Sequence, residues 1–169
     1  MQQLSSMQDL MVMSLQELHS AETQLLSAMP AVLGAVSSPE LQDGLTRHMR
    51  ETEGQVRRLE QVLGQLGEQP GGRHSRAAEA LLAEVREIAQ LPGDPDVKDA
   101  ALLAAQQKFE HNEIACYGTA VTHAKQLGNQ QAADLLAQTL DEEERMDKAL
   151  TQLAKSRVNR EAESAAPSA

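Results

Sequence analysis

Apolar side chains recur three and four positions apart along most of the chain, which is the period of an α-helix that buries one face. In the first such stretch, Met11, Leu15, Leu18, Leu25 and Met29 share a face. The pattern breaks at short segments that contain glycine or proline. It predicts four long helices, over residues 3–36, 39–66, 95–127 and 130–157, and a shorter helix over residues 76–90.

The segments between these helices carry residues that commonly begin or end a helix. The start signals are Ser38-Pro39-Glu40, Asp94 before Pro95, and Asn129, and the stop signals are Gly67 and Gly128. Serine, aspartate and asparagine cap the free amides of a helix start, and glycine adopts the left-handed backbone of a helix end. Pro30 should kink the first helix near its end, or stop it.

The order and spacing of the predicted helices favour one all-α domain. Because only a short loop at residues 128–129 separates the last two long helices, we expect those helices to be antiparallel. The long connection of residues 67–94, with its own short helix, could cross the bundle. This is the topology of a ferritin-like antiparallel four-helix bundle with an extra short helix in the crossover. We predict that this domain covers residues 1–158 and that residues 159–169, which are small and polar, form a disordered tail.

Acidic residues interrupt the apolar faces of the long predicted helices. Glu22 takes an apolar position on the first helix, and Glu143 stands on the last helix where a leucine would fit. On the second helix His48 and Glu51 are three positions apart and share a face. A buried carboxylate is costly unless it is paired or binds a metal. The candidate metal-binding residues are Glu22, His48, Glu51, Glu110, Glu113 and Glu143.

Carboxylates from four helices that meet near the middle of a bundle would repel one another strongly without cations. Ferritin-like di-iron and di-manganese bundles solve this problem with two divalent metal ions. They take a glutamate from each of two helices and a Glu-x-x-His pair from each of the other two. Oxygen donors with an imidazole suit iron or manganese better than metals that prefer thiolates. We therefore predict two divalent metal ions, iron first, with manganese as the alternative.

The spacing of the candidate residues departs from that arrangement. The pairs in chain order are His48-x-x-Glu51, Glu110-x-x-Glu113 and Glu143-x-x-Met146. The first pair reverses the usual order, the second has no histidine, and the third has methionine where the second histidine would stand. The expected site is richer in carboxylates and has one imidazole, which leaves the identity of the metal and its redox potential open.

Composition limits the partners of the protein. Of 169 residues, 41% are hydrophobic, with one Phe, one Tyr and no Trp, which favours helices over sheet. The net charge of −10 argues against nucleic acid as a partner. The single cysteine cannot form an internal disulfide and suits a reducing compartment. We see no signal peptide and no apolar stretch near the ~20 residues of a membrane span, so we expect a cytoplasmic protein without a membrane partner.

Four stretches of the chain resemble the YciE/YciF family of bacterial ferritin-like proteins. They are Glu17-Leu-His-Ser-Ala-Glu22-Thr-Gln, His48-Met-Arg-Glu51-Thr, Phe109-Glu110-His-Asn-Glu113-Ile-Ala-Cys-Tyr117-Gly, and Leu140-Asp-Glu-Glu143 with Leu150-Thr-Gln-Leu-Ala after it. The resemblance covers nearly the whole chain except the tail. It implies a ferritin-like bundle, a di-metal centre, a homodimer and an association with stress responses. Family members often have tyrosine at the position of His19, which implies different hydrogen bonding here.

Within the predicted centre we assign roles to the candidate residues. We expect Glu51 and Glu113 to bridge the two metal ions, and the terminal ligands to be Glu22, His48, Glu110 and Glu143. Tyr117 follows Glu113 by one turn and could donate a hydrogen bond to a ligand or act in one-electron chemistry, although a buried, hydrogen-bonded tyrosine is commoner. Cys116 is expected to be a small core residue, because no base is placed beside it.

Other acids and histidines are expected to lie outside the set of ligands. Glu142 and Asp147 flank Glu143 and should be solvated or next to the ligands, and Glu144 should lie on the outer face. The histidines that we expect to be uninvolved are His74, His111 and His123.

The predicted function is that of a di-iron or iron–manganese carboxylate protein with oxidase or peroxide-detoxifying activity. The stress association comes from the resemblance, no catalytic residue is assigned, and whether the protein turns over a substrate is left open. The alternative is a non-catalytic, stress-induced structural or interaction protein whose metal site is structural or vestigial. An iron-storage cage is less favoured, because the sequence reveals no large symmetric assembly surface.

Overall fold

The computed structural model describes residues 4–165, and every regular element among them is helical. The elements are α1 (Met7–Ala35), α2 (Pro39–Gln65), α3 (Arg76–Gln90), α4 (Pro95–Gln126), α5 (Gln130–Leu153), the π-helical turn η1 (Ala154–Val158) and α6 (Asn159–Ser164). The predicted all-α class is therefore confirmed. Residue 3, where the pattern starts the first helix, lies outside the described residues. Among the helices described, none has the length and apolar character needed to cross a membrane.

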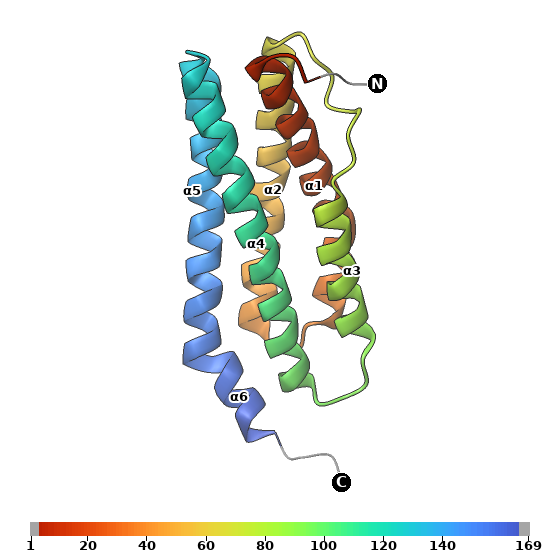
Figure 1. The fold of residues 1–169 in the computed structure, drawn as a ribbon. Helices are drawn as coiled ribbons and strands as arrows, with labels where there is room; N and C mark the ends of the chain where they lie inside the picture. The colour runs from red at the N-terminus through yellow and green to blue at the C-terminus, as the bar shows by residue number, and fades with distance from the viewer. Residues whose placement is uncertain (1–3, 166–169) are drawn as a thin grey trace.

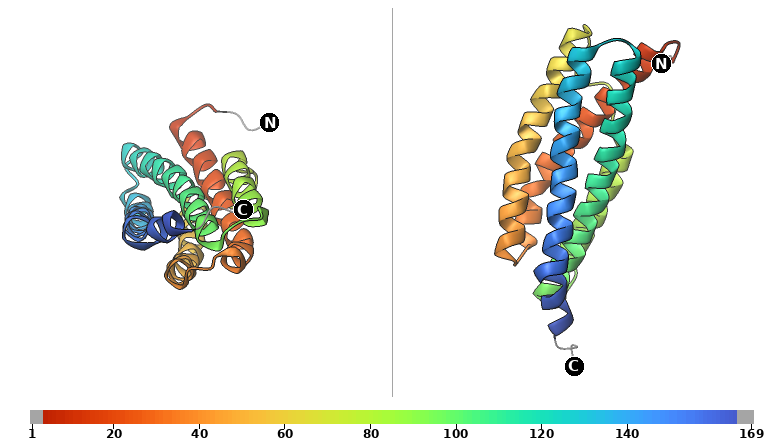
Figure 2. Two further views of the ribbon diagram at one scale, coloured as in Figure 1. Left: turned by 90° about the horizontal axis from the view of Figure 1, so that it is seen from below. Right: turned by 90° about the vertical axis from the view of Figure 1, so that its left-hand side faces the viewer.

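The four long helices lie side by side in an antiparallel bundle (Figure 1). α1 contacts α2 and α4, and α5 also contacts α2 and α4, as the right-hand view of Figure 2 shows for α5. The short loop before α5 makes α4 and α5 antiparallel, as predicted. The long connection from α2 returns the chain to the other end of the bundle, and its helix α3 packs against α1 and α4.

Helices begin and end at the residues that the sequence signals. The side chains of Ser38, Asp94 and Asn129 each accept hydrogen bonds from backbone amides two or three residues further on. These contacts satisfy amides that have no partner inside the helix. Gly67 and Gly128 follow α2 and α4 with φ angles of 75° and 70°, in the left-handed region that favours glycine.

Two details at the helix ends differ from the pattern. α1 begins at Met7, whereas the pattern starts the first helix at residue 3, and residues 4–6 are not helical. It continues to Ala35, as the predicted range does, so Pro30 does not stop it. At the other end of the chain, the helix continues through η1 into α6, so the expected disorder from residue 159 does not hold for Asn159–Ser164. The reason is that Val158 is buried in the core, with 1% of its surface exposed, and that α6 packs against α4. Residues 166–169 of the predicted tail lie outside the described residues.

The interior of the bundle has two apolar regions with a polar layer between them. One region includes Leu45 and Phe109 and lies at the α3 end, and the other includes Leu15 and Leu136. The residues of this layer lie on the long helices, at or next to the point where the two regions meet. They are Glu22, His48, Thr52, Gln55, Gln106, Glu110, Glu113, Thr139 and Glu143. Each fully buried leucine stabilises the fold by roughly 1.5–3 kcal/mol, and the two regions together offset the cost of this layer.

Candidate metal centre

The polar layer brings one histidine and three glutamates to a single point. His48 comes from α2, and one of its ring nitrogens lies within 4.8 Å of an oxygen from each of three glutamates. These three oxygens also lie within 4.8 Å of one another. The glutamates are Glu110 and Glu113 of α4 and Glu143 of α5. All four side chains are fully buried, with none of their surface exposed. Their chemistry and spacing mean that this cluster could hold a metal ion.

A further carboxylate reaches this layer from α1. Glu22 is fully buried and interacts electrostatically with Glu113 and Glu143. The hydroxyl of Tyr117 donates a hydrogen bond to Glu22 Oε1 at 2.5 Å, which is one of the two roles considered for this tyrosine. The structure thus places Glu22 with the cluster, so that each of the four long helices contributes at least one side chain.

The glutamates of this layer show a regular division between held and unpaired oxygens. In each of Glu22, Glu110 and Glu143, a neighbouring side chain donates to Oε1, and Oε2 has no hydrogen-bond partner. The three donors are Tyr117, Gln106 and Gln55 respectively. Neither oxygen of Glu113 has a hydrogen-bond partner. Buried polar atoms are rarely left unpaired, so these oxygens favour the binding of a cation or a proton.

The imidazole of His48 faces two of these carboxylates, through the held oxygen of Glu110 and the unpaired oxygen of Glu143. Its Nε2 lies 3.3 Å from Glu110 Oε1 and 3.9 Å from Glu143 Oε2, and neither ring nitrogen makes a hydrogen bond of acceptable geometry. Among the described residues, every buried side-chain nitrogen or oxygen without a hydrogen bond belongs to this layer, except Nδ1 of His123. In the part of the chain that the structure describes, the unsatisfied buried groups are therefore concentrated around the His48 cluster.

Burial raises the pKa of the carboxyl groups in the layer. It raises the pKa of Glu110 to about 7. Burial also raises the pKa of Glu22, Glu113 and Glu143 well above the usual range, and for the first two repulsion from neighbouring carboxylates adds to it. Burial therefore favours the protonated form of these groups. A divalent cation among them would replace the protons and balance the negative charge of the carboxylates.

The structure does not bring Glu51 into the cluster. Glu51 is exposed, whereas His48, Thr52 and Gln55 of the same helix are buried. At about 100° per residue, Glu51 is rotated by about 60° from His48 around the helix axis, which is enough to leave the inward face. Its side chain lines a surface cavity of about 230 Å³ between α2 and α5, together with Arg145.

Two residues next to the cluster were given no definite role by the sequence. Gln55 is fully buried, and its amide nitrogen contacts Glu143 and, at 3.2 Å, Glu142 Oε2. Glu142 is 8% exposed and pairs with Arg58, so the expectation that it lies beside the ligands holds in place of the solvated alternative. The signal that could have indicated Gln55 is an amide at an inward position of an apolar helix face.

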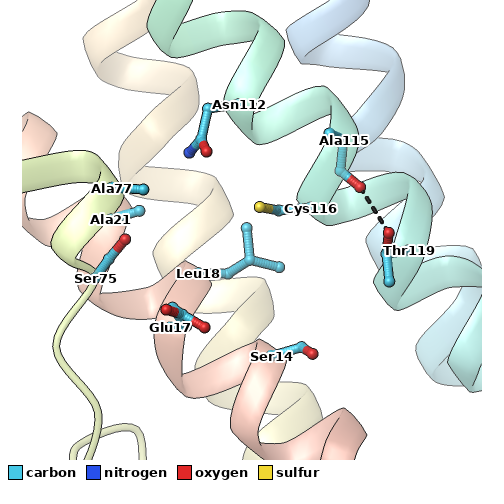
Figure 3. Close-up of a pocket in the computed structure, with 10 residues that line it drawn as sticks. All are labelled: Ser14, Glu17, Leu18, Ala21, Ser75, Ala77, Asn112, Ala115, Cys116 and Thr119. Atoms are coloured by element: carbon cyan, nitrogen blue, oxygen red, sulfur yellow. Dashed lines mark hydrogen bonds between the residues drawn. The ribbon is translucent and has the colours of Figure 1, made fainter. Parts of the chain in front are cut away.

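Cys116 lies away from the cluster. It is half-buried and lines a cavity of about 320 Å³ between α1, the start of α3 and α4, which Figure 3 shows with Glu17, Leu18 and Asn112 around it. Burial raises the pKa of the Cys116 thiol, so the thiol is protonated at neutral pH and is a poor nucleophile.

The histidines expected to be uninvolved do not join the His48 cluster among the described residues. His111 lies 3.3 Å from Asp147, and His74 lies 3.1 Å from Glu79, in both cases through Nε2 at exposed positions. Surface pairs of this kind contribute little to stability.

Fold and site together define an all-helical bundle with a buried His/Glu cluster able to hold a metal. The family model described as "Domain of unknown function (DUF892)" matches residues 6–163. Protein YciF of Escherichia coli (strain K12) is 40% identical over 164 residues, which cover 96% of this chain and 99% of that protein. The chain therefore belongs to the YciE/YciF family, as its sequence motifs indicate.

Solved structures support the same assignment. The crystal structure of the E. coli stress protein YciF matches with a TM-score of 0.89 and 39% identity, over 93% of this chain and 99% of that chain. YcfI of Rhodopseudomonas palustris, a proposed structural protein, matches with a TM-score of 0.84 and 36% identity, over 87% and 94% of the two chains. A protein from Xanthomonas campestris pv. campestris shares the fold, with a TM-score of 0.77 at 22% identity over 94% of this chain and 97% of that chain.

Proposed function

We propose that the chain is a di-metal carboxylate protein of the ferritin-like class. It binds two divalent cations, iron first and manganese as the alternative, between α1, α2, α4 and α5. The observation that carries this proposal is the set of buried glutamate oxygens and histidine nitrogens that lack hydrogen-bond partners. Such a set is costly to bury unless it is protonated or binds a cation, and its oxygen and imidazole donors suit iron and manganese.

Some carboxylate oxygens have a hydrogen-bond donor and others have none, and this difference suggests the role of each ligand. Glu113 is the proposed bridging ligand, because both of its oxygens are unpaired and it interacts with three other glutamates. Each proposed terminal ligand has at least one oxygen or nitrogen without a hydrogen-bond partner. These ligands are Glu22, His48, Glu110 and Glu143. Glu51, which the sequence pattern assigns as a second bridge, is exposed and is not part of this set.

The proposed activity is the reduction of oxygen or peroxide during stress. Iron in this centre would supply the one-electron chemistry that such a reaction needs. The chain's own groups hold and isolate the site: the glutamates supply negative charge, Tyr117 fixes Glu22, and the apolar regions on either side exclude water. A relative with 39% identity is described as a stress protein, which agrees with this role.

The test begins with the purified protein and its metal content. The protein is then loaded with Fe²⁺ in air, and oxidation is followed by absorbance. We expect about two metal ions per chain and oxidation faster than that of free Fe²⁺. Failure to bind any divalent metal, with the helical fold intact by circular dichroism, would rule out the proposed function.

A second candidate is a non-catalytic structural or interaction protein whose metal site serves stability alone or is vestigial. The description of YcfI as a proposed structural protein favours it. So does the exposed position of Glu51, which leaves the centre with one carboxylate fewer than the sequence pattern offers. Stoichiometric metal without faster Fe²⁺ oxidation or peroxide consumption would support this candidate over the enzyme.

We also propose that the protein is a cytoplasmic homodimer without nucleic-acid or membrane partners. The net charge of −10 supports the exclusion of nucleic acid, and the family resemblance supports the dimer. Light scattering that shows a dimer would also set aside an iron-storage cage, whereas a large symmetric assembly would contradict this proposal.

A further inference from the structure

We propose that Gln55 is a positioning residue that fixes Glu143 for metal binding through one oxygen, and that Glu142 and Arg58 hold Gln55 in place. This inference rests on the proposed function, since it assigns roles around the same centre. It concerns three residues that are not in the predicted set of ligands.

The contacts of Glu143 differ for its two oxygens. Its Oε1 accepts a hydrogen bond from Nε2 of Gln55, a residue with none of its surface exposed. Its Oε2 has no hydrogen-bond partner and lies 3.9 Å from His48 Nε2. Gln55 therefore occupies Oε1 and leaves Oε2, the oxygen that approaches the imidazole, without a hydrogen-bond partner. The geometry favours a Glu143 carboxylate that binds metal through Oε2 alone.

The orientation of the Gln55 amide is determined by its neighbours. Its nitrogen donates to Glu143 and, at 3.2 Å, to Glu142 Oε2, so two carboxylates stand on the same side of the amide. Ionised carboxylates only accept hydrogen bonds. If the amide were reversed, its oxygen would face two carboxylate oxygens and both hydrogen bonds would be lost. Gln55 is thus held with its donor toward Glu143.

Glu142 in turn is fixed by a guanidinium group. Arg58, one turn after Gln55 on α2, pairs with the same Oε2 of Glu142 and donates through Nε to Thr139 Oγ1 at 2.9 Å. The exposed fractions of the Arg58 and Glu142 side chains are 15% and 10%, so this pair is shielded from solvent. The positive charge balances Glu142 and allows an acid next to Glu143 to be buried. The result is a continuous chain of contacts, Arg58–Glu142–Gln55–Glu143, between α2 and α5.

The first test compares Gln55→Leu with wild type in a titration with Co²⁺, whose visible spectrum reports coordination. The matched control is Gln61→Leu, the same change at an exposed position of the same helix. For Gln55→Leu we expect the Kd to rise about 10–100-fold, as is usual when a partner of a metal ligand is removed, and the spectrum of bound Co²⁺ to change. The control should match wild type in both measurements.

The second test asks whether Gln55 acts through Glu143. Gln55→Leu is combined with Glu143→Ala, a variant that keeps four ligands for a weaker Co²⁺ site. If Gln55 acts by positioning Glu143, the double variant should bind Co²⁺ within about twofold of Glu143→Ala alone. Glu142→Gln keeps the size of that side chain but weakens its pairing with Arg58. It should raise the Kd in the wild-type background and have no effect in the Gln55→Leu background.

The outcomes separate this inference from the proposed function. Absence of Co²⁺ and Fe²⁺ binding by the wild type would overturn both. Normal binding by the wild type, combined with additive effects of Gln55→Leu and Glu143→Ala, would overturn only the positioning role and show that Gln55 is a structural link. The positioning role is also overturned if Gln55→Leu, shown to be folded by circular dichroism, gives the Co²⁺ spectrum of wild type.

Discussion

The carboxylate oxygens of the polar layer differ in what they contact, and this difference supports the role that we propose for each glutamate. Glu22, Glu110 and Glu143 each present one oxygen to a hydrogen-bond donor and leave the other unpaired. Donors of this kind fix the direction of a carboxylate before a cation arrives, which lowers the ordering cost of binding. Glu113 has no such donor among the described side chains and is the carboxylate most dependent on a cation or on protons.

Replacing Glu113 by alanine should therefore separate metal binding from folding. We expect loss of tight binding at one of two metal positions, because the bridging carboxylate is gone. The metal-free protein should be as stable as wild type, or more stable by about 1–3 kcal/mol, because a buried, repelled carboxyl group is removed. Metal analysis and urea unfolding measure the two effects.

Glu51→Ala is the matched control for this variant, since it removes an exposed acid from the same predicted set. It should keep both metal ions and nearly unchanged stability. Retention of two tightly bound metal ions by Glu113→Ala would refute the bridging role, and their loss from Glu51→Ala would show that Glu51 turns inward when metal binds.

The raised pKa values give the metal-free protein a definite pH dependence. Burial raises the pKa of Glu110 to about 7, so between pH 4.5 and 7 the folded state holds a proton that the unfolded state has lost. The free energy of unfolding should therefore fall as the pH rises through this window, by on the order of 3 kcal/mol from this group. Glu22, Glu113 and Glu143 act in the same direction.

Metal affinity should change in the opposite sense, because a cation and protons compete for the same oxygens. It should strengthen as the pH rises through about 7, the pKa of Glu110. Urea unfolding of chelator-treated protein between pH 5 and 8, and Co²⁺ titrations over the same range, measure both trends. A metal-free protein that becomes more stable as the pH rises would contradict the assignment of buried, protonated carboxyls.

At the scale of the helices, one contact ties the start of α4 to the loop between α1 and α2. Asp99 is 1% exposed, and its two oxygens accept hydrogen bonds from the backbone amides of Ser37 at 2.9 Å and Ser38 at 2.6 Å. Ser38 is also the residue that caps α2. Asp99 therefore connects three of the four long helices at the end of the bundle where α1 stops and α4 begins.

Asp99→Ala should destabilise the protein by about 2–4 kcal/mol, since it leaves the buried amide of Ser38 and the partly buried amide of Ser37 without their charged acceptor. Asp96→Ala, an exposed position three residues earlier in α4, serves as the control and should cost less than about 1 kcal/mol. Urea denaturation of both variants, with metal removed, gives the comparison. Equal losses for the two variants would show that the Asp99 contacts do not hold the helices together.

Across the whole molecule, two apolar regions enclose a layer that repels itself unless it is neutralised. Metal binding should consequently stabilise the entire fold. At a free metal concentration about 100 times the Kd, the gain should be about 2.7 kcal/mol, which corresponds to a rise in Tm of roughly 5–10 °C for a chain of this size. A chelator should reverse the rise.

Differential scanning calorimetry with and without Fe²⁺ or Mn²⁺, under anaerobic conditions, measures this shift. Glu113→Ala should show a smaller shift than wild type, because it lacks the proposed bridge. An unchanged Tm at a metal concentration that saturates the site by titration would show that the bound ions do not neutralise the buried layer.

The fold of this protein could be predicted largely from local patterns. The periodicity of apolar residues placed five helices, and Ser38, Asp94 and Asn129 marked their starts, because both signals depend on neighbours within one helix. For the candidate site, the pattern could tell only which face of a helix each residue lies on. This was enough to group Glu22, His48, Glu110, Glu113 and Glu143, which are all buried. It was too coarse for Glu51, which a rotation of about 60° from His48 places in solvent.

By itself, then, the sequence determined the helices, most of their boundaries and the presence of inward-facing acids, since a repeat along one helix encodes which side is buried. Tertiary structure alone decided which of these acids converge, which oxygen of each is held, and that Gln55, Glu142 and Arg58 adjoin the centre. Those facts depend on how α2 and α5 are rotated and shifted against each other. No pattern within a single helix records that relation, because it is set by the packing of many side chains between helices far apart in the chain.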